Sequence, residues 1–501
     1  MKTFLLAVGY MALALMAAAA DTAEPFAIRG FHLDLRIQVM KMPALRQFAE
    51  QLSHNGINTL IVEWEGTYPY RQDPLIANRY AYTRDEIAGF VQFCRSLGIT
   101  VVPLQQSFGH VEYILRHDKY KALREDEKDL SQVCPSETEG NRALFTRLYT
   151  DLASTHPGPY IHIGGDETYL LGHCEKCKKR AAEAGLSRLY FDHIKMLCDI
   201  VVGLGKRPVL WADIALKYPE YIHLLPRQTV FIDWNYGWPA DRFGNHLKLV
   251  GSGYEIWGAP AIRSDPDNYY LTCWQKHFDN IRDFIPFCRS VGYKGIVMTS
   301  WSTSGAYSSV YDSENALLEL SAIRHVYPVG GFDMLIQAFE QAVADPQPLD
   351  VTRFIARYAH DRYGLDSRDA GLLQQALFTA PYKAQASNAR ALLDSARAAA
   401  HILHALNPAA NTDEFAHYRL MADIRVFYLE FMVIQTSLND GTIAVTDAIT
   451  HLDALRKEQP RLDQEFIRLN RDLLYPSALD EENRLRNERV DQLYERLSRS
   501  R

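Results

Sequence analysis

The sequence predicts an α/β fold, namely a (β/α)8 TIM barrel over residues 21–328 followed by an α-helical C-terminal domain over residues 329–501. Two observations favour the barrel: apolar, β-branched runs alternate with helical patterns, and eight such runs precede residue 320. Strands that alternate with helices pair in parallel, and eight such units close a (β/α)8 barrel. The third observation is a change near residue 330, after which alanine, leucine and arginine recur at helical spacing.

The strand-like runs are short and apolar, and most are separated by enough residues for a helix. They cover residues 27–35, 57–64, 99–105, 159–165, 207–213, 229–234, 252–259 and 294–301. Among the helical patterns, TRDEIAGFVQFCRSLG has clear limits, because Thr83 and Glu86 form a capping box and Gly98 marks the end. The stretches PALRQFAEQLSHNG and NRALFTRLYTDLAS predict further helices.

The N-terminal stretch MKTFLLAVGYMALALMAAAA has the three parts of a signal peptide, which we assign to residues 1–20. Lys2 is the positive part, Phe4 to Met16 the apolar part, and an A-x-A site precedes Asp21. A retained anchor is the alternative, but the apolar stretch is short for a membrane span. No later stretch of the sequence approaches the ~18 apolar residues of a transmembrane helix. We therefore expect an exported protein, periplasmic or secreted, without a stable membrane span.

Composition and charge narrow the choice of partners. The 501 residues are 47% hydrophobic and carry a formal net charge of −7, which is ordinary for a soluble globular protein. The basic residues are scattered, so we expect no nucleic-acid partner. The sequence has no G-x-G-x-x-G or P-loop stretch to hold a nucleotide, and we expect no cofactor. The C-terminal helices pack on the barrel in the simplest interpretation and could also provide a homodimer surface.

Seven cysteines are too few for a disulfide scaffold in a chain of this length. Cys174 and Cys177 form a CxxC pair, which can be half of a zinc site, a redox pair or a structural disulfide. His173 and the distant Cys134 could complete four zinc ligands, but the sequence has only one CxxC. We therefore favour simple thiols or a disulfide, and we expect no metal.

The fourth run, PYIHIGGDETYL, ends in two glycines that are followed by the adjacent carboxylates Asp166 and Glu167. Like charges at the end of a buried strand raise one another's pKa, and burial raises the pKa of both. We expect Asp166 to be ionised and Glu167 to stay protonated near neutral pH. Neighbouring strand residues point to opposite faces, so the pair must lie where the glycines let the strand curl.

Polar and aromatic residues also lie at the ends of other runs, where a (β/α)8 barrel has its active site. Aromatic rings stack on the C–H faces of sugars, and charged or amide groups hydrogen-bond the hydroxyls, so this mixture favours a pyranose. Asp34, Arg36, Glu63 and Glu65 end the first two runs. The predicted substrate-binding residues at later strand ends are Trp211, Asp233, Trp234, Trp257 and Trp301.

The HIGGDE stretch resembles the active-site signature of glycoside hydrolase family 20, the β-N-acetylhexosaminidases. RGFHLD resembles the family's first strand, with Arg29 in the place of its sugar-binding arginine, and QQSFGHVEYILR resembles the end of its third strand, with His110. LWAD, with Trp211, and SW, with Trp301, resemble its pocket tryptophans. The resemblance covers residues 27–320 and lies nearest to the hexosaminidase D-like branch, some members of which lack the N-terminal accessory domain.

The resemblance implies an exo-acting enzyme that hydrolyses terminal β-linked GlcNAc or GalNAc with retention, through attack by the substrate's own acetamido oxygen. It makes Glu167 the general acid and base, and Asp166 the acceptor of the acetamido N–H. It also requires a tyrosine on the acetamido carbonyl. Either Tyr236 or Tyr254 fits, and Tyr236 is favoured because Asp233 and Trp234 lie beside it.

Alternatives remain for single residues and for the whole chain. Arg29 could instead be a buried ion-pair partner of Asp34, and His110 could be structural. A non-catalytic exported glycan-binding protein on a hydrolase scaffold would not need the Asp166–Glu167 pair. Diguanylate cyclases share the letters GGDE, but their motif continues with phenylalanine, whereas Thr168 follows here.

Overall fold

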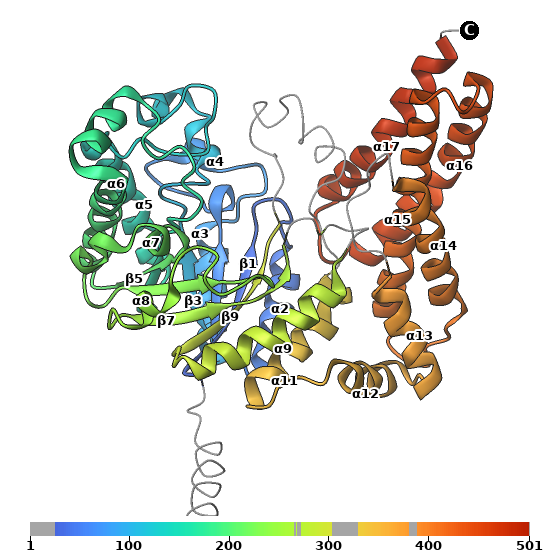
Figure 1. Cartoon of the computed structure of the whole chain (residues 1–501), viewed down its shortest axis with the longest axis horizontal. Coiled ribbons are helices and arrows are strands. Elements are labelled where there is room, and N and C mark those ends of the chain that lie inside the picture. Colours follow the sequence, from blue (N-terminus) through green and yellow to red (C-terminus); the bar gives the residue numbers. More distant parts are fainter. Residues whose placement is uncertain (1–25, 265–266, 268–271, 303–328, 380–387, 500–501) are drawn as a thin grey trace, which may run out of the picture.

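The N-terminal part of the chain is a closed parallel barrel in the computed structural model, which describes residues 26–264, 267, 272–302, 329–379 and 388–499 (Figure 1). The barrel strands are β1 (Ile28–Asp34), β2 (Thr59–Glu63), β3 (Thr100–Leu104), β4 (Tyr160–His162), β5 (Arg207–Trp211), β6 (Val230–Trp234), β7 (Glu255–Ala259) and β9 (Gly295–Ser300). They pair in this order, and β9 pairs with β1 to close the ring. The (β/α)8 architecture is therefore confirmed, and each predicted run contains one barrel strand. The predicted signal peptide, residues 1–20, lies outside the described residues.

The short strand β8 (Ala261–Arg263) continues the direction of β7 beyond Pro260 and pairs with the end of β9. It lengthens the sheet at the carboxyl ends of the strands without adding a ninth member to the ring.

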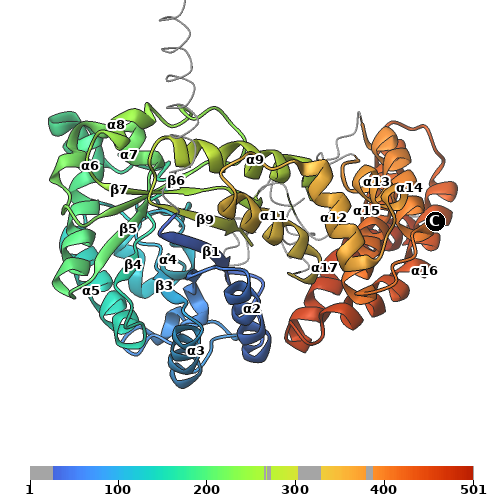
Figure 2. The same ribbon diagram turned by 90° about the horizontal axis from the view of Figure 1, so that it is seen from below.

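Helices surround the barrel strands (Figure 2). The longer ones are α2 (Met42–His54), α3 (Arg84–Ser96), α5 (Thr138–Thr155), α6 (Glu175–Gly203) and α9 (Trp274–Ser290). Shorter helical turns are α4 (Glu112–Leu115), α7 (Asp213–Lys217), α8 (His246–Val250), η1 (Glu65–Thr67), η2 (Pro74–Ile76), η3 (Asp118–Leu123) and η4 (Pro219–Leu224). The predicted capping box opens α3: the Thr83 hydroxyl accepts from the Glu86 amide, and the Glu86 carboxylate accepts from the Thr83 amide.

Alternation along each strand decides which side chains fill the barrel and which face the helices. In β6, Val230 and Ile232 point into the barrel with the other members of the inner apolar cluster. Phe231 points outward and packs in the large core between strands and helices. By the same alternation, each polar side chain at a strand end points either into the open end of the barrel or outward toward the surrounding helices.

The C-terminal segments are helical and lie beside the barrel (Figures 1 and 2). They are η5 (Val329–Phe332), α11 (Asp333–Ala344), α12 (Val351–Tyr363), α13 (Ser367–Leu377), α14 (Ala389–Ala405), α15 (Thr412–Asn439), α16 (Val445–Asn470) and α17 (Pro476–Arg499). The Trp274 ring of α9 stacks on Phe332 at 5.4 Å. The Lys41 amide donates to the Leu473 carbonyl over 2.8 Å. These contacts join the helical region to the barrel.

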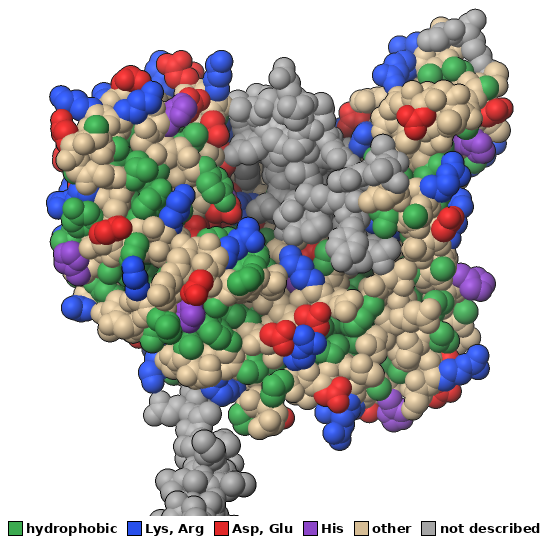
Figure 3. Space-filling view, in the orientation of Figure 1, with side chains coloured by type: hydrophobic (Ala, Val, Ile, Leu, Met, Phe, Trp, Pro, Cys, Tyr) green, Lys and Arg blue, Asp and Glu red, His purple; other side chains and the backbone are tan. Residues whose placement is uncertain are grey.

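The surface of the molecule mixes charges of both signs. On the face shown in Figure 3, lysine and arginine side chains are interspersed with aspartate and glutamate over both the barrel and the C-terminal helices. Within the described ranges, none of the helices has the combined length and hydropathy of a bilayer-crossing segment.

Candidate active site

The two glycines after β4 turn the chain out of the strand, as predicted. Gly164 and Gly165 have φ of 73° and 93°, values that residues other than glycine rarely adopt. A Cβ on Gly164 would lie 2.1 Å from Oε1 of Gln106, so the chain also needs glycine here for space. Glu167 itself has a φ of 47°, and strand alternation no longer applies to it. Asp166 and Glu167 can therefore face the same neighbour.

That neighbour is His110, which follows β3 and has a φ of 54°. Its Nε2 lies 3.5 Å from Oδ2 of Asp166 and 3.3 Å from Oε2 of Glu167. Asp166 is 5% exposed, whereas a third of the Glu167 side chain is exposed. The structure thus brings the predicted pair and His110 together, with Asp166 inside and Glu167 on the solvent side.

One carboxylate oxygen of Asp166 accepts no hydrogen bond from the described residues. This oxygen, Oδ1, is buried. A buried carboxylate oxygen without a donor is costly, by about 1–3 kcal/mol or more. Such an atom in a site is suited to receive an N–H or O–H from a bound molecule.

The charge state of Glu167 differs from the prediction. Burial raises the pKa of Glu167, but hydrogen bonds from His110 and from the Tyr169 hydroxyl at 2.8 Å outweigh burial and lower its pKa. Burial lowers the pKa of His110, but Asp166 and Glu167 outweigh that effect and raise it well above its usual range. The lowered pKa does not agree with the expectation of a neutral Glu167, because the His110 imidazolium from another loop stabilises the charge of Glu167.

One carboxyl group beside the pair has a strongly raised pKa: Asp213, at the start of α7. Its Oδ2 accepts the Glu167 amide over 3.1 Å, and burial, reinforced by the charge of Asp166, raises the pKa of Asp213 to about 8. The sequence signal was present in LWAD, where Asp213 lies two residues after Trp211, the last residue of β5. Its part in the site was missed because adjacency in the chain drew the interpretation to Asp166 and Glu167.

Four predicted aromatic residues meet at the carboxyl ends of the strands. The Trp301 indole N–H donates to the Tyr236 hydroxyl over 2.7 Å. The Trp211 and Trp301 rings lie 5.5 Å apart, and Trp211 ends the inward face of β5. Trp234 ends the inward face of β6, with its ring 5.1 Å from Tyr236.

Arg36, just beyond β1, lies at this end of the barrel. Its guanidinium bonds to both oxygens of Asp34, at 2.9–3.1 Å, and its Nε lies 3.7 Å from a carboxylate oxygen of Glu63 and of Glu65. Its carbon Cζ lies 5.5 Å from the centre of the Trp301 ring. The sequence did mark Arg36 as a strand-end residue, but the family resemblance directed the sugar-binding role to Arg29.

Arg29 lies at the opposite end of the barrel, which overturns its predicted role. It is the second residue of β1, and its guanidinium donates to the backbone carbonyls of Gly56, at 2.8 Å, and Phe26, at 3.4 Å. The alternative pairing with Asp34 is also wrong, since Asp34 is paired with Arg36.

Three further predicted residues lie away from the site. Asp233 has the outward parity of β6, and its Oδ2 accepts the Tyr293 hydroxyl over 2.5 Å. Tyr254 precedes β7 and donates to backbone carbonyls in and after η4, so Tyr236 is the better placed of the two tyrosines. Trp257 is fully buried in the barrel interior against Tyr160, the first residue of β4.

The CxxC pair lies beside the site rather than in it. Cys174 and Cys177 open α6 and gather with Cys134 around the buried Glu125. All seven cysteines are unpaired thiols in the structure, so of the two favoured alternatives the structure has simple thiols rather than a disulfide. His173 instead contacts Asp126 at 3.1 Å.

A parallel (β/α)8 barrel whose mouth joins paired carboxylates to an arginine and several tryptophans defines an enzyme of the glycosidase class. Comparison with known proteins agrees with this class. The family model described as "Glycosyl hydrolase family 20, catalytic domain" matches residues 26–325, more than half of the chain. The chain belongs to glycoside hydrolase family 20, as its resemblance predicted.

The individual relatives share less than a third of their residues with this chain. Hexosaminidase D of Homo sapiens is 27% identical over 337 residues, which are 63% of this chain and 68% of that protein. Hexosaminidase D of Bos taurus is 27% identical over 310 residues, 58% of this chain and 87% of that protein. Among solved structures, the β-N-acetylhexosaminidase from Bacteroides fragilis is similar, with 18% identity, a TM-score of 0.49, and 67% of this chain and 69% of that chain covered.

Proposed function

We propose that this protein is an exo-acting β-N-acetylhexosaminidase that removes terminal β-linked GlcNAc or GalNAc from glycans with retention. The observation that carries the proposal is the pairing of two unlike carboxylates: Asp166 has a buried oxygen without a donor in the described structure, and Glu167 beside it is accessible. A 2-acetamido sugar offers one N–H for the first and a glycosidic oxygen for the second.

The chemistry divides between the substrate and this pair. The acetamido oxygen attacks the anomeric carbon as the glycosidic C–O bond breaks, and Glu167 gives a proton to the departing oxygen. Asp166 accepts the acetamido N–H and stabilises the positive charge of the oxazolinium intermediate. Water then attacks the anomeric carbon, and Glu167 takes its proton, which returns the enzyme to its starting state.

The proton that Glu167 must donate is held by His110 in the substrate-free state. The His110 imidazolium lies 3.3 Å from Oε2 of Glu167, within reach of a direct transfer. A sugar bound over Glu167 excludes water from its carboxylate, and desolvation favours the neutral acid. We therefore propose that substrate binding moves one shared proton from His110 to Glu167.

The remaining contacts suit a pyranose ring. Trp301 offers apolar ring surface backed by the fully buried Trp211, and we assign the Tyr236 hydroxyl, which accepts from the Trp301 indole, as the donor to the acetamido carbonyl. Arg36 supplies the charged donors for the ring hydroxyls from the end of β1. This assignment replaces Arg29 with Arg36.

The assay that tests the proposal compares matched chromogenic β-glycosides of GlcNAc, GalNAc and glucose on the full chain. We expect release from both acetamido sugars and a large loss with the glucoside, which lacks the internal nucleophile. A thiazoline that mimics the cyclised intermediate should inhibit tightly. A glycan-binding protein would bind but release nothing, and equal rates on the glucoside would contradict substrate assistance.

We also propose that the chain is exported and that residues 1–20 are its signal peptide. The charged, apolar and small-residue parts of this stretch support the proposal. N-terminal sequencing of the protein from its native host should begin at Asp21. A mature protein that begins at Met1 in the cytoplasm would contradict it.

A further inference from the structure

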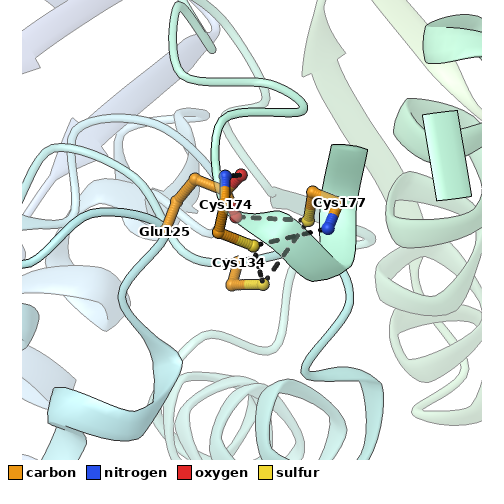
Figure 4. A group of neighbouring side chains, drawn as sticks. All are labelled: Glu125, Cys134, Cys174 and Cys177. Carbon is orange, nitrogen blue, oxygen red and sulfur yellow. Dashed lines mark hydrogen bonds between the residues drawn. The ribbon is translucent and has the colours of Figure 1, made fainter. Parts of the chain in front are cut away.

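Beside the active site, four side chains with metal-binding chemistry point toward one another (Figure 4). They are Glu125, Cys134, Cys174 and Cys177, and their ligand atoms all lie within 4.8 Å of one another. Three thiols and one carboxylate make up a complete donor set for a tetrahedral zinc ion. They come from three places: the segment after η3, the segment before α5, and the first turn of α6.

The spacing of the sulfur atoms fits a shared ion. The Cys134 sulfur lies 3.6 Å from that of Cys174 and 3.5 Å from that of Cys177. With zinc–sulfur bonds of 2.3 Å, the edge of a tetrahedron is about 3.8 Å, so small movements would complete the coordination. A disulfide needs its sulfur atoms at about 2.05 Å, and a disulfide between any two of these cysteines would leave the third thiol against Glu125.

The surroundings stabilise negative charge on the ligands. Cys174 is the N-cap of α6, and its sulfur accepts the Cys177 amide over 3.4 Å, where the helix dipole favours thiolate. The Ser136 hydroxyl lies 3.0 Å from the Cys177 sulfur. Basic residues follow in the first turns of α6, in the sequence EKCKKR. A thiolate at this place has both hydrogen bonds and nearby positive charge.

Glu125 carries the clearest indication of a cation. It is 3% exposed, and its oxygens contact the Cys174 amide at 2.8 Å and the Cys177 sulfur at 3.2 Å, rather than a basic side chain of the described structure. Buried carboxylates are normally paired with a cation or coordinate a metal. Three thiols and a lone buried carboxylate without a cation therefore make a poor structural core but a complete metal site.

We propose that Cys134, Cys174, Cys177 and Glu125 bind one structural Zn²⁺, which ties together the two loops that carry the active-site pair and His110. His110 lies on the chain between β3 and α5, which also provides Glu125 and Cys134. Asp166 and Glu167 lie between β4 and Cys174. The ion thus holds both partners of the His110–Glu167 contact, with the Leu170 amide bonded to Gln132 at 3.0 Å as a second link.

Metal analysis of the purified full chain tests the site without reference to activity. We expect one zinc ion per chain in the wild type, and visible absorption bands of tetrahedral thiolate coordination after replacement by Co²⁺. Cys134→Ser and Cys174→Ser should lose the metal. The matched control is Cys94→Ser, which alters a buried thiol of α3 outside the cluster and should keep the metal.

Variants of Glu125 separate coordination from general damage to the fold. Glu125→Gln should weaken zinc affinity by at least about tenfold, and Glu125→Cys should restore it by offering a fourth thiolate. If the purified wild type contains no zinc and takes up no Co²⁺, or if non-reducing mass analysis finds a disulfide among the three cysteines, the proposal is wrong. Equal metal content in wild type and all cysteine variants would also overturn it.

The link to the active site predicts a second readout. Removal of zinc by a chelator should lower kcat more than it raises KM, because the His110–Glu167 contact loosens while the sugar-binding rings stay in place. Restoring zinc should restore kcat. If the chelated protein, shown by metal analysis to be zinc-free, keeps its full kcat, the ion does not position the catalytic loops.

Discussion

The two ends of the barrel carry the same kinds of side chain in different roles. At the carboxyl ends of the strands, Arg36 and Trp301 lie beside each other and close to buried carboxylates. At the amino ends, Arg29 bonds to backbone carbonyls and Trp257 donates to Glu255 within the packed interior. Residue type alone therefore does not mark a site. The height along the strand and the parity of the side chain decide whether a residue meets substrate or only its neighbours.

Substitution of carboxylates should give the largest difference in activity between the two ends of the barrel. Glu167→Gln should lower kcat/KM by about 10²–10⁴-fold, most severely for leaving groups that need protonation, and Asp166→Asn by about 10²–10³-fold. The control is Glu255→Gln at the amino end, where the carboxylate bonds to Arg207 and Trp257. It should change activity little. Steady-state kinetics with nitrophenyl and alkyl glycosides measures both, and equal losses at the two ends would erase the distinction.

Substitution of the two arginines should give the next largest difference in kcat/KM. Arg36→Lys keeps the charge beside Asp34 but loses the planar fork, and we expect a fall of about tenfold to a hundredfold in kcat/KM. Arg29→Lys should leave kcat/KM near the wild-type value and lower only the melting temperature. A sugar-binding role for Arg29 would instead appear as a raised KM in that variant.

The tyrosines give a smaller contrast. Tyr236→Phe removes the hydroxyl that accepts from the Trp301 indole and that we propose donates to the acetamido carbonyl, and it should lower kcat/KM by about tenfold. Tyr254→Phe frees two backbone carbonyls and should lower stability by about 1 kcal/mol without a change in kinetics. Kinetics and thermal melts on both variants check the pair, and the reverse pattern would restore Tyr254 as the site residue.

The smallest effect on activity is expected at two buried aspartates, which differ instead in how they make stability depend on pH. The pKa of Asp213 is raised to about 8 and that of Asp233 to about 6, both mainly by burial. A raised carboxyl pKa means that the folded state binds more protons than the unfolded state, so stability falls as pH rises from about 4 to the folded pKa. Asp213→Asn should therefore gain about 1–3 kcal/mol relative to wild type by pH 8, and nothing near pH 4.

Asp233→Asn should show a smaller gain, complete by about pH 6, because its folded pKa is lower. Melting temperatures of the three proteins measured from pH 4 to pH 9 compare the two windows. A wild-type protein whose stability rises over this range relative to Asp213→Asn would show that Asp213 is ionised in the folded state.

The barrel could be predicted because its evidence is repeated. Eight apolar runs at regular spacing each contain one strand, and an error in any one would not have changed the count. The Asp166–Glu167 pair could be predicted because both residues and the glycines that turn the chain lie within one short stretch. A motif contained in one short stretch can be interpreted without knowing which distant residues pack against it.

The rest of the site depends on parity and on distant partners. Asp233 could have been placed outside by counting alternate residues back from Trp234, which points inward. Trp257 could not have been placed, since an inward tryptophan fits at either height. The low pKa of Glu167 depends on His110, more than fifty residues earlier, and so does not follow from adjacency. Cys134 and Glu125 reach the CxxC pair only through the folded loops.

Of the four non-glycine residues with positive φ among the described residues, Glu65, His110 and Glu167 lie at the catalytic end. Each left-handed backbone costs about 1–2 kcal/mol that glycine would avoid. A laboratory selection for heat resistance alone would therefore favour glycine at these positions, and the selected variants would melt later and lack side chains of the candidate active site. At these three positions, the residue that would raise thermal stability differs from the residue that the candidate active site uses.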